Sequence, residues 1–174
     1  MRRATVLLDW DTASRFGWLR NEVRRTTLRR RPCDVKIAVI QKGIAGALRR
    51  LSNDIWRVEL RVYHGWHQGA TPTDDRRDFE SVRDRSSRVI DRVSFDRELR
   101  FGNELLCGGQ RSKLMNTLRT RETKCCGSSK VEQKMVDTAI AADLLHLARS
   151  RVEYPNDWLI IVGDDTDLLP PAIT

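Results

Sequence analysis

The sequence lacks any long hydrophobic run. Its longest uninterrupted apolar stretches are about five residues, as in Trp158–Val162, whereas a membrane-spanning helix needs roughly 20. After Arg2 and Arg3, the apolar stretch Ala4–Leu8 stops at Asp9, and a secretory signal peptide needs roughly 7–15 apolar residues there. We therefore expect a soluble, cytoplasmic protein with no membrane partner.

Several common site motifs are missing as well. The four cysteines, at positions 33, 107, 125 and 126, form no C-x-x-C pair, and the only closely spaced histidines are His64 and His67. A structural zinc site is therefore not expected, and the cysteines are interpreted as reduced thiols. The chain also has no G-x-x-x-x-G-K-[ST] phosphate loop, no arrangement that supports a Ser-His-Asp triad, and no internal repeat.

Arginine, in contrast, is abundant. The chain has 32 Lys and Arg residues against 24 Asp and Glu, a net charge of +8, and 26 of the basic residues are Arg. Arg binds phosphates through two parallel hydrogen bonds and stacks on bases, so the composition favours a nucleic-acid partner. A solvated Arg-rich surface is the alternative, because net charge alone says nothing about fold.

The length and apolar content fit one folded domain. The chain has 174 residues, of which 40% are hydrophobic, enough to bury a core. Apolar runs predict strands at Thr5–Leu8, Val35–Ile40, Trp56–Tyr63 and Trp158–Val162, with one or two more between residues 89 and 124. Helical periodicity predicts helices at 13–31, Ile44–Asn53 and Val131–Arg149, and a surface helix within 67–88.

This alternation predicts an α/β fold in which helices flank a mostly parallel sheet. In such sheets ligands bind beyond the carboxyl ends of the strands. Two groups of acids lie there: Asp9 and Asp11 follow the first strand, and Asp164, Asp165 and Asp167 follow the last. The alternatives are a helix cap for Asp9 and an Asx-rich turn for the later group.

Two further acids lie on the helix before the last strand. Its apolar stripe consists of Val136, Ile140, Leu144 and Leu147. Asp137 and Asp143 lie on the two edges of this stripe, about 120° apart. An acid beside a buried face is costly unless it is paired or binds a cation, although Asp137 also suits a first helical turn and Asp143 also suits a salt bridge to Arg149 or Arg151.

Converging carboxylates suit a hard divalent cation. Mg²⁺ takes carboxylate oxygens as ligands, and one or two such ions activate water and stabilise the leaving oxygen of a phosphodiester. The expected cofactor is therefore Mg²⁺ or Mn²⁺. We expect the nucleic acid to follow the basic face of helix 13–31, with Arg20, Arg24, Arg25 and Arg29 at phosphates, or otherwise Arg49, Arg50 and the 76–92 segment.

Three blocks of sequence resemble the NYN domain of the PIN-like ribonuclease superfamily. They are VLLDWDTA, KMVDTAIAADLL and LIIVGDDTDLLPPA, in the family's order and about 40 residues in all. The resemblance implies a Rossmann-like α/β/α sandwich and metal-dependent cleavage of RNA. It implies that Asp9, Asp137, Asp165 and Asp167 are catalytic and bind the metal. It also implies that Asp143 is a metal ligand. Asp11 is a further candidate ligand.

The sequence departs from this family's pattern at several positions. Thr12 replaces an Asn that orients metal or water, Met135 replaces a Gly, and Asp164 is an added acid. Family members continue through another helix beyond the position of Thr174. Residues 1–174 are therefore interpreted as one nuclease domain that is either part of a longer protein or reduced at its end.

Two other functions compete with the ribonuclease. A non-catalytic RNA-binding or interaction module would have the same fold with degenerate acids. A haloacid-dehalogenase-like phosphatase would use Asp9 as nucleophile and Asp11 as general acid, but its motif places Thr one residue later than Thr12. The sequence leaves open RNA against DNA, the RNA class, the biological role, partner proteins and the oligomeric state.

Overall fold

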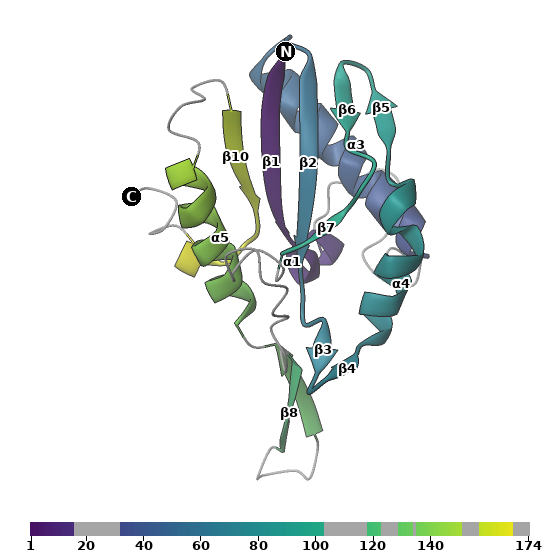
Figure 1. The fold of residues 1–174 in the computed structure, drawn as a ribbon, viewed down its shortest axis with the longest axis vertical. Coiled ribbons are helices and arrows are strands. Elements are labelled where there is room, and N and C mark those ends of the chain that lie inside the picture. Colours follow the sequence, from purple (N-terminus) through teal and green to yellow (C-terminus); the bar gives the residue numbers. More distant parts are fainter. Residues whose placement is uncertain (16–31, 103–117, 123–128, 134, 151–156, 169–174) are drawn as a thin grey trace.

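A mostly parallel five-strand sheet forms the centre of the protein, seen here in a computed structural model (Figure 1). The structure describes residues 1–15, 32–102, 118–122, 129–133, 135–150 and 157–168. The strand order is β10-β1-β2-β6-β5, and only β5 runs antiparallel to its neighbour. The bounds are β1 (Arg2–Asp9), β2 (Trp56–Tyr63), β5 (Arg88–Ile90), β6 (Val93–Phe95) and β10 (Asp157–Val162); a short β7 (Arg100–Phe101) also pairs with β2.

Helices cover both faces of this sheet. Val6 and Leu8 of β1 pack in one hydrophobic core with α3 (Cys33–Leu51), while Leu7 packs in a second core with α5 (Val136–Ser150). Successive residues of a strand point to opposite faces, so the two helices lie on opposite sides of β1. The remaining helical segments are α1 (Trp10–Arg15), α4 (Asp74–Val82), η1 (Arg83–Arg85) and η3 (Thr166–Leu168). The expected Rossmann-like α/β architecture is confirmed.

Two small hairpins lie beyond the carboxyl end of the sheet. One consists of β3 (His67–Gln68) and β4 (Thr71–Pro72) and follows β2. The other consists of β8 (Leu118–Glu122) and β9 (Ser129–Gln133) and extends away from the sheet (Figure 1). Neither hairpin joins the central sheet.

The strand expected at Val35–Ile40 is wrong. These residues belong to α3, which continues through Ile44 and Leu48. Ile37, Ile40, Ile44 and Leu48 all lie in the core, and their spacing of three and four residues is that of one helix face. The run VKIAVI is apolar without alternation, and such a run fits a buried helix as well as a buried strand.

Other boundaries differ from those expected. Helix 13–31 is described only to Arg15, and the rest of it lies outside the described residues. The helix expected at Val131–Arg149 begins at Val136, because residues 131–133 belong to β9. Met135 separates the two with a φ of +64°, the left-handed region that favours glycine.

The expected strands at Trp56–Tyr63 and Trp158–Val162 are confirmed, as is a surface helix within 67–88. In the part of the chain that the structure describes, none of the helices has the length and apolar character needed to cross a membrane.

Gly102 has no room for a side chain, which yields a stability prediction. A Cβ there would lie 2.1 Å from ring atoms of Tyr63, a buried residue at the end of β2. We expect Gly102→Ala to lower the free energy of unfolding by about 2 kcal/mol, as overpacking does. Gly46→Ala is the control: its Cβ would come no nearer than 3.9 Å to Arg50 Nη1, so it should stabilise α3 by up to about 1 kcal/mol. Urea unfolding measures both, and equal effects would contradict the packing described.

Candidate active site at the carboxyl end of the sheet

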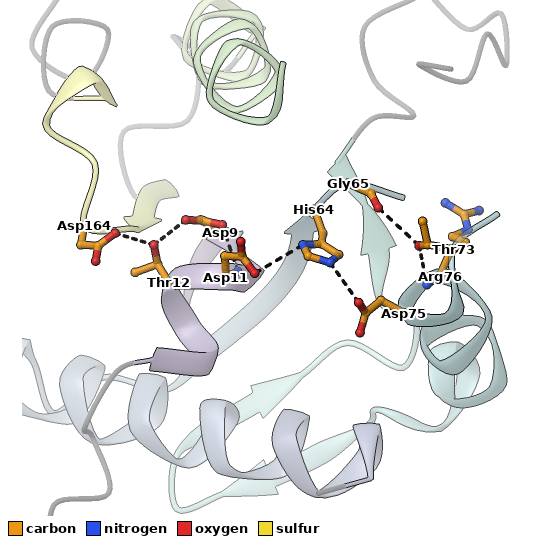
Figure 2. Close-up of polar contacts among 9 residues, drawn as sticks. All are labelled: Asp9, Asp11, Thr12, His64, Gly65, Thr73, Asp75, Arg76 and Asp164. Carbon is orange, nitrogen blue, oxygen red and sulfur yellow. Dashed lines mark hydrogen bonds and ion pairs between the residues drawn. The ribbon is translucent and has the colours of Figure 1, made fainter. Parts of the chain in front are cut away.

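Asp9 is the last residue of β1 and the centre of the candidate site. Its carboxylate is largely buried, at 8% exposure, and α1 begins at the next residue. The backbone N–H of Asp11 donates to Asp9 Oδ1 at 3.1 Å, and the hydroxyl of Thr12 donates to Asp9 Oδ2 (Figure 2). Burial raises the pKa of Asp9, while these hydrogen bonds oppose the increase.

Thr12 connects Asp9 to the loop after β10. Its Oγ1 also lies 2.6 Å from Asp164 Oδ1 (Figure 2). A hydroxyl has one hydrogen and donates to one acceptor at a time. The single hydroxyl hydrogen therefore serves only one of these two carboxylates at a time. Burial is the largest cause of the raised pKa of Asp9, and the charge of Asp11 adds to it.

Asp137 lies in the first turn of α5, and its pKa is affected by the charges of the other acids. Partial burial raises the pKa of this carboxyl, and the negative charges of Asp165, Asp9 and Asp167 raise it further. The four acids expected to be catalytic come from the end of β1, the start of α5 and the loop after β10, and the other three lie close enough to Asp137 for their charges to act on it.

The loop after β10 is held by its own contacts. Asp165 Oδ1 accepts the backbone N–H of Asp167 at 2.9 Å, and Leu168 inserts into the core beneath α5. A Cβ at Gly163 would lie 3.3 Å from Leu168 Cδ1 and 3.9 Å from Asp9 Cβ. The loop therefore passes close to Asp9, while the side chains of Asp165 and Asp167 remain exposed.

A histidine lies beside these acids. His64 lies within 4 Å of carboxylate oxygens of Asp11 and Asp75 near this end of β1. Over the described residues, no three His, Cys, Asp or Glu side chains are arranged to hold one metal ion. A shared ion would therefore require the exposed carboxylates to rotate toward Asp9.

Asp11, a further candidate ligand, faces His64. Its Oδ1 lies 3.9 Å from His64 Nδ1, and His64 Nε2 lies 3.2 Å from Oδ2 of Asp75 in the first turn of α4 (Figure 2). His64 is 9% exposed. It joins α1 to α4 directly beside the acid group. His64 is not among the residues predicted for the site, although it follows β2 at the edge where ligands bind.

Asp143, the other additional candidate, lies in the interior. It is 1% exposed and accepts a hydrogen bond of 2.6 Å from the hydroxyl of Tyr63. Burial raises the pKa of Asp143 to about 6, against the opposing effects of Tyr63, Arg61 and His146. Asp143 thus joins α5 to β2 through Tyr63. Of the two arginines that were the alternative salt-bridge partners, Arg151 lies outside the described residues.

The expected nucleic-acid track is only partly visible. Arg20, Arg24, Arg25 and Arg29 lie outside the described residues. In the alternative track, Arg76 is buried, donates to Glu80 and lies 3.4 Å from the centre of the Phe101 ring. This arginine therefore serves the packing of α4.

Comparisons with known proteins add no relative. The chain matches no protein-family model, no curated protein and no solved structure.

The buried Asp143 yields a pH prediction. Its pKa is raised on folding from 3.8 to about 6, so the folded state favours the neutral carboxyl. The stabilisation is present below pH 4 and is lost as the pH rises past 6. The loss amounts to about 3 kcal/mol, since one pKa unit corresponds to about 1.4 kcal/mol.

Asp143→Asn tests this directly, because the amide cannot ionise and its oxygen still accepts from Tyr63. Between pH 4 and pH 7, the unfolding free energy of the native chain should fall by about 3 kcal/mol relative to that of the variant. Urea unfolding at each pH measures the difference. If the difference in unfolding free energy between the two proteins stays constant with pH, the carboxyl of Asp143 is not buried as described.

Proposed function

We propose that the protein is a metal-dependent ribonuclease that hydrolyses RNA phosphodiester bonds. The observation that carries this proposal is that Asp9, Asp165 and Asp167 lie close enough to Asp137, at the carboxyl end of a parallel sheet, for their charges to add to the effect of burial in raising the pKa of Asp137. The resemblance of the same residues to the NYN pattern supports it.

The donor set fits Mg²⁺ or Mn²⁺. Both ions prefer carboxylate oxygens, and a cation would relieve the contact of Thr12 with two carboxylates. Asp9, Asp137, Asp165 and Asp167 would hold the ion. When bound, the ion supplies charge stabilisation at the phosphate and lowers the pKa of a water nucleophile.

The chain's own residues have distinct tasks in this scheme. Asp9 is fixed by the Asp11 N–H and the Thr12 hydroxyl, so its orientation is set before any substrate binds. Thr12 takes the place of the family's Asn with its hydroxyl and also fixes Asp164. Asp165 and Asp167 are exposed, which leaves them free to approach substrate.

A non-catalytic RNA-binding module is the second candidate. It is favoured by the finding that no three metal-binding side chains are arranged around one point among the described residues. The experiment below separates the two functions.

We expect the purified protein to cleave single-stranded RNA with Mg²⁺ or Mn²⁺ and to stop when the metal is chelated. Asp9→Asn and Asp165→Asn should each slow cleavage by about 100-fold or more, since several kcal/mol of charge stabilisation depends on the ion. RNA binding by these variants should persist.

Asp91→Asn is the matched control. Asp91 lies between β5 and β6, pairs with Arg49 at 3.8 Å and has a φ of +53°, a conformation that Asn tolerates. Its cleavage rate should equal that of the native chain. Calorimetric titration with Mn²⁺ gives a second readout, in which Asp9→Asn should weaken binding. RNA binding without cleavage by any metal, and without Mn²⁺ uptake, would favour the non-catalytic module.

A further inference from the structure

The β8–β9 hairpin projects from the same end of the protein as the acid group (Figure 1). β9 ends at Gln133 and α5 begins at Val136, so Asp137 follows the hairpin by four residues. Each strand of the hairpin has 5 residues, a length of about 17 Å. The hairpin therefore reaches well beyond the acids while remaining joined to the helix that carries one of them.

The neighbouring β3–β4 hairpin, which β8 contacts, is firmly held. The hydroxyl of Thr73 lies 3.3 Å from Gly65 O and accepts the backbone N–H of Arg76 at 3.3 Å (Figure 2). Trp66 is fully buried and packs edge-on against Phe79 and Phe101. The β8–β9 hairpin thus rests against a fixed part of the fold.

The excess positive charge of the chain is concentrated in two segments. Residues 110–134, which include the β8–β9 hairpin, have seven basic and two acidic residues, and residues 16–31 have six and one. Outside these segments the acidic residues outnumber the basic ones. Residues 16–31 lie outside the described part of the chain. Of the basic residues in 110–134, the described strands of the hairpin contain Arg119, Arg121 and Lys130, together with Glu122 and Glu132.

The register of the hairpin gathers basic positions on one face. Arg121 pairs with Lys130, and Arg119 pairs with Glu132. Because alternate residues of a strand fall on opposite faces, these four positions share a face of the ribbon, and three of them are basic.

The acid group itself repels polyanions. Asp137, Asp165 and Asp167 are exposed, and carboxylates repel the phosphates of RNA. A nuclease site of this kind needs cations outside the metal centre to retain a long substrate. A basic ribbon joined directly to α5 meets that need.

We propose that the β8–β9 hairpin is a phosphate-binding arm that holds single-stranded RNA as it leaves the acid group. The inference rests on the proposed ribonuclease function and adds the surface that retains substrate. The arm contacts phosphates several nucleotides from the cleaved bond, so it acts on long RNA and leaves the cleavage of a dinucleotide unchanged.

The test compares RNA binding by charge variants, all with Asp9→Asn and in chelator so that nothing is cleaved. The probe is a labelled oligouridine of about 30 nucleotides, and its anisotropy is followed from low to high salt. R119Q/R121Q/K130Q should weaken binding about tenfold at about 0.1 M salt, and the slope of log K against log salt should become shallower by about 2.

Two controls make the result specific. R3Q/R57Q/R149Q removes the same charge from exposed positions near the amino ends of β1 and β2 and in the last turn of α5, outside both expected nucleic-acid tracks, and it should change affinity and slope much less. R119K/R121K keeps the charge and should keep the affinity. Thermal unfolding by circular dichroism shows whether the variants are folded.

The outcomes separate this inference from the ribonuclease proposal. Equal losses in the hairpin variant and the R3Q/R57Q/R149Q control, or a loss in R119K/R121K as large as that in the glutamine variant, would overturn the proposal that the hairpin binds phosphates. Loss of binding confined to the glutamine hairpin variant supports the arm even if the native chain cleaves no RNA with any metal, a result that would overturn only the ribonuclease. In an active protein, the same glutamine changes should raise KM for long RNA and leave dinucleotide cleavage unchanged.

Discussion

Repulsion between carboxylates at one end of a parallel sheet is the constraint on which this site depends. Asp9, Asp137, Asp165 and Asp167 come from three separate parts of the chain, and burial followed by the charges of the other three acids raises the pKa of Asp137. Folding gains nothing from bringing like charges together, so the packing around them must hold them in place. Such an arrangement is typical of a site that binds a cation or retains protons.

The packing that holds the acids is visible on both sides of the sheet. Leu7 and Leu168 belong to the core under α5, and the hydrogen bond from Tyr63 to Asp143 joins that helix to β2. On the other side, Val6 and Leu8 pack with α3. These contacts fix the end of β1 and the start of α5, which are the elements that carry Asp9 and Asp137.

The strand ends, and therefore much of the site, could be predicted from the sequence. Asp9 and Asp165 follow apolar runs whose ends are plain in the sequence, and parallel strands bring such ends to one edge. The run at Val35–Ile40 was misread because apolar runs without alternation fit helix and strand alike. His64 was missed although the same rule applies to it, since it directly follows β2.

Contacts that depend on three-dimensional pairing could not be predicted. Thr12 bridges Asp9 and Asp164 because β1 and β10 lie side by side, and nothing in the local sequence indicates that. The burial of Asp143 against Tyr63 depends likewise on how α5 crosses β2. Of the β8–β9 hairpin, β8 lies in the region between residues 89 and 124 where one or two strands are expected. β9 was missed because the sequence pattern extends the following helix through residues 131–133.

The most direct measurement of the central claim is the pKa of individual Asp carboxyls by carbon-13 NMR titration. In the native chain the pKa of Asp137 should lie above its ordinary value, because of partial burial and then the charges of Asp165, Asp9 and Asp167. Asp165→Asn should lower the pKa of Asp137, and Asp91→Asn should leave it unchanged. An identical pKa of Asp137 in the native chain and in Asp165→Asn would show that these acids do not meet.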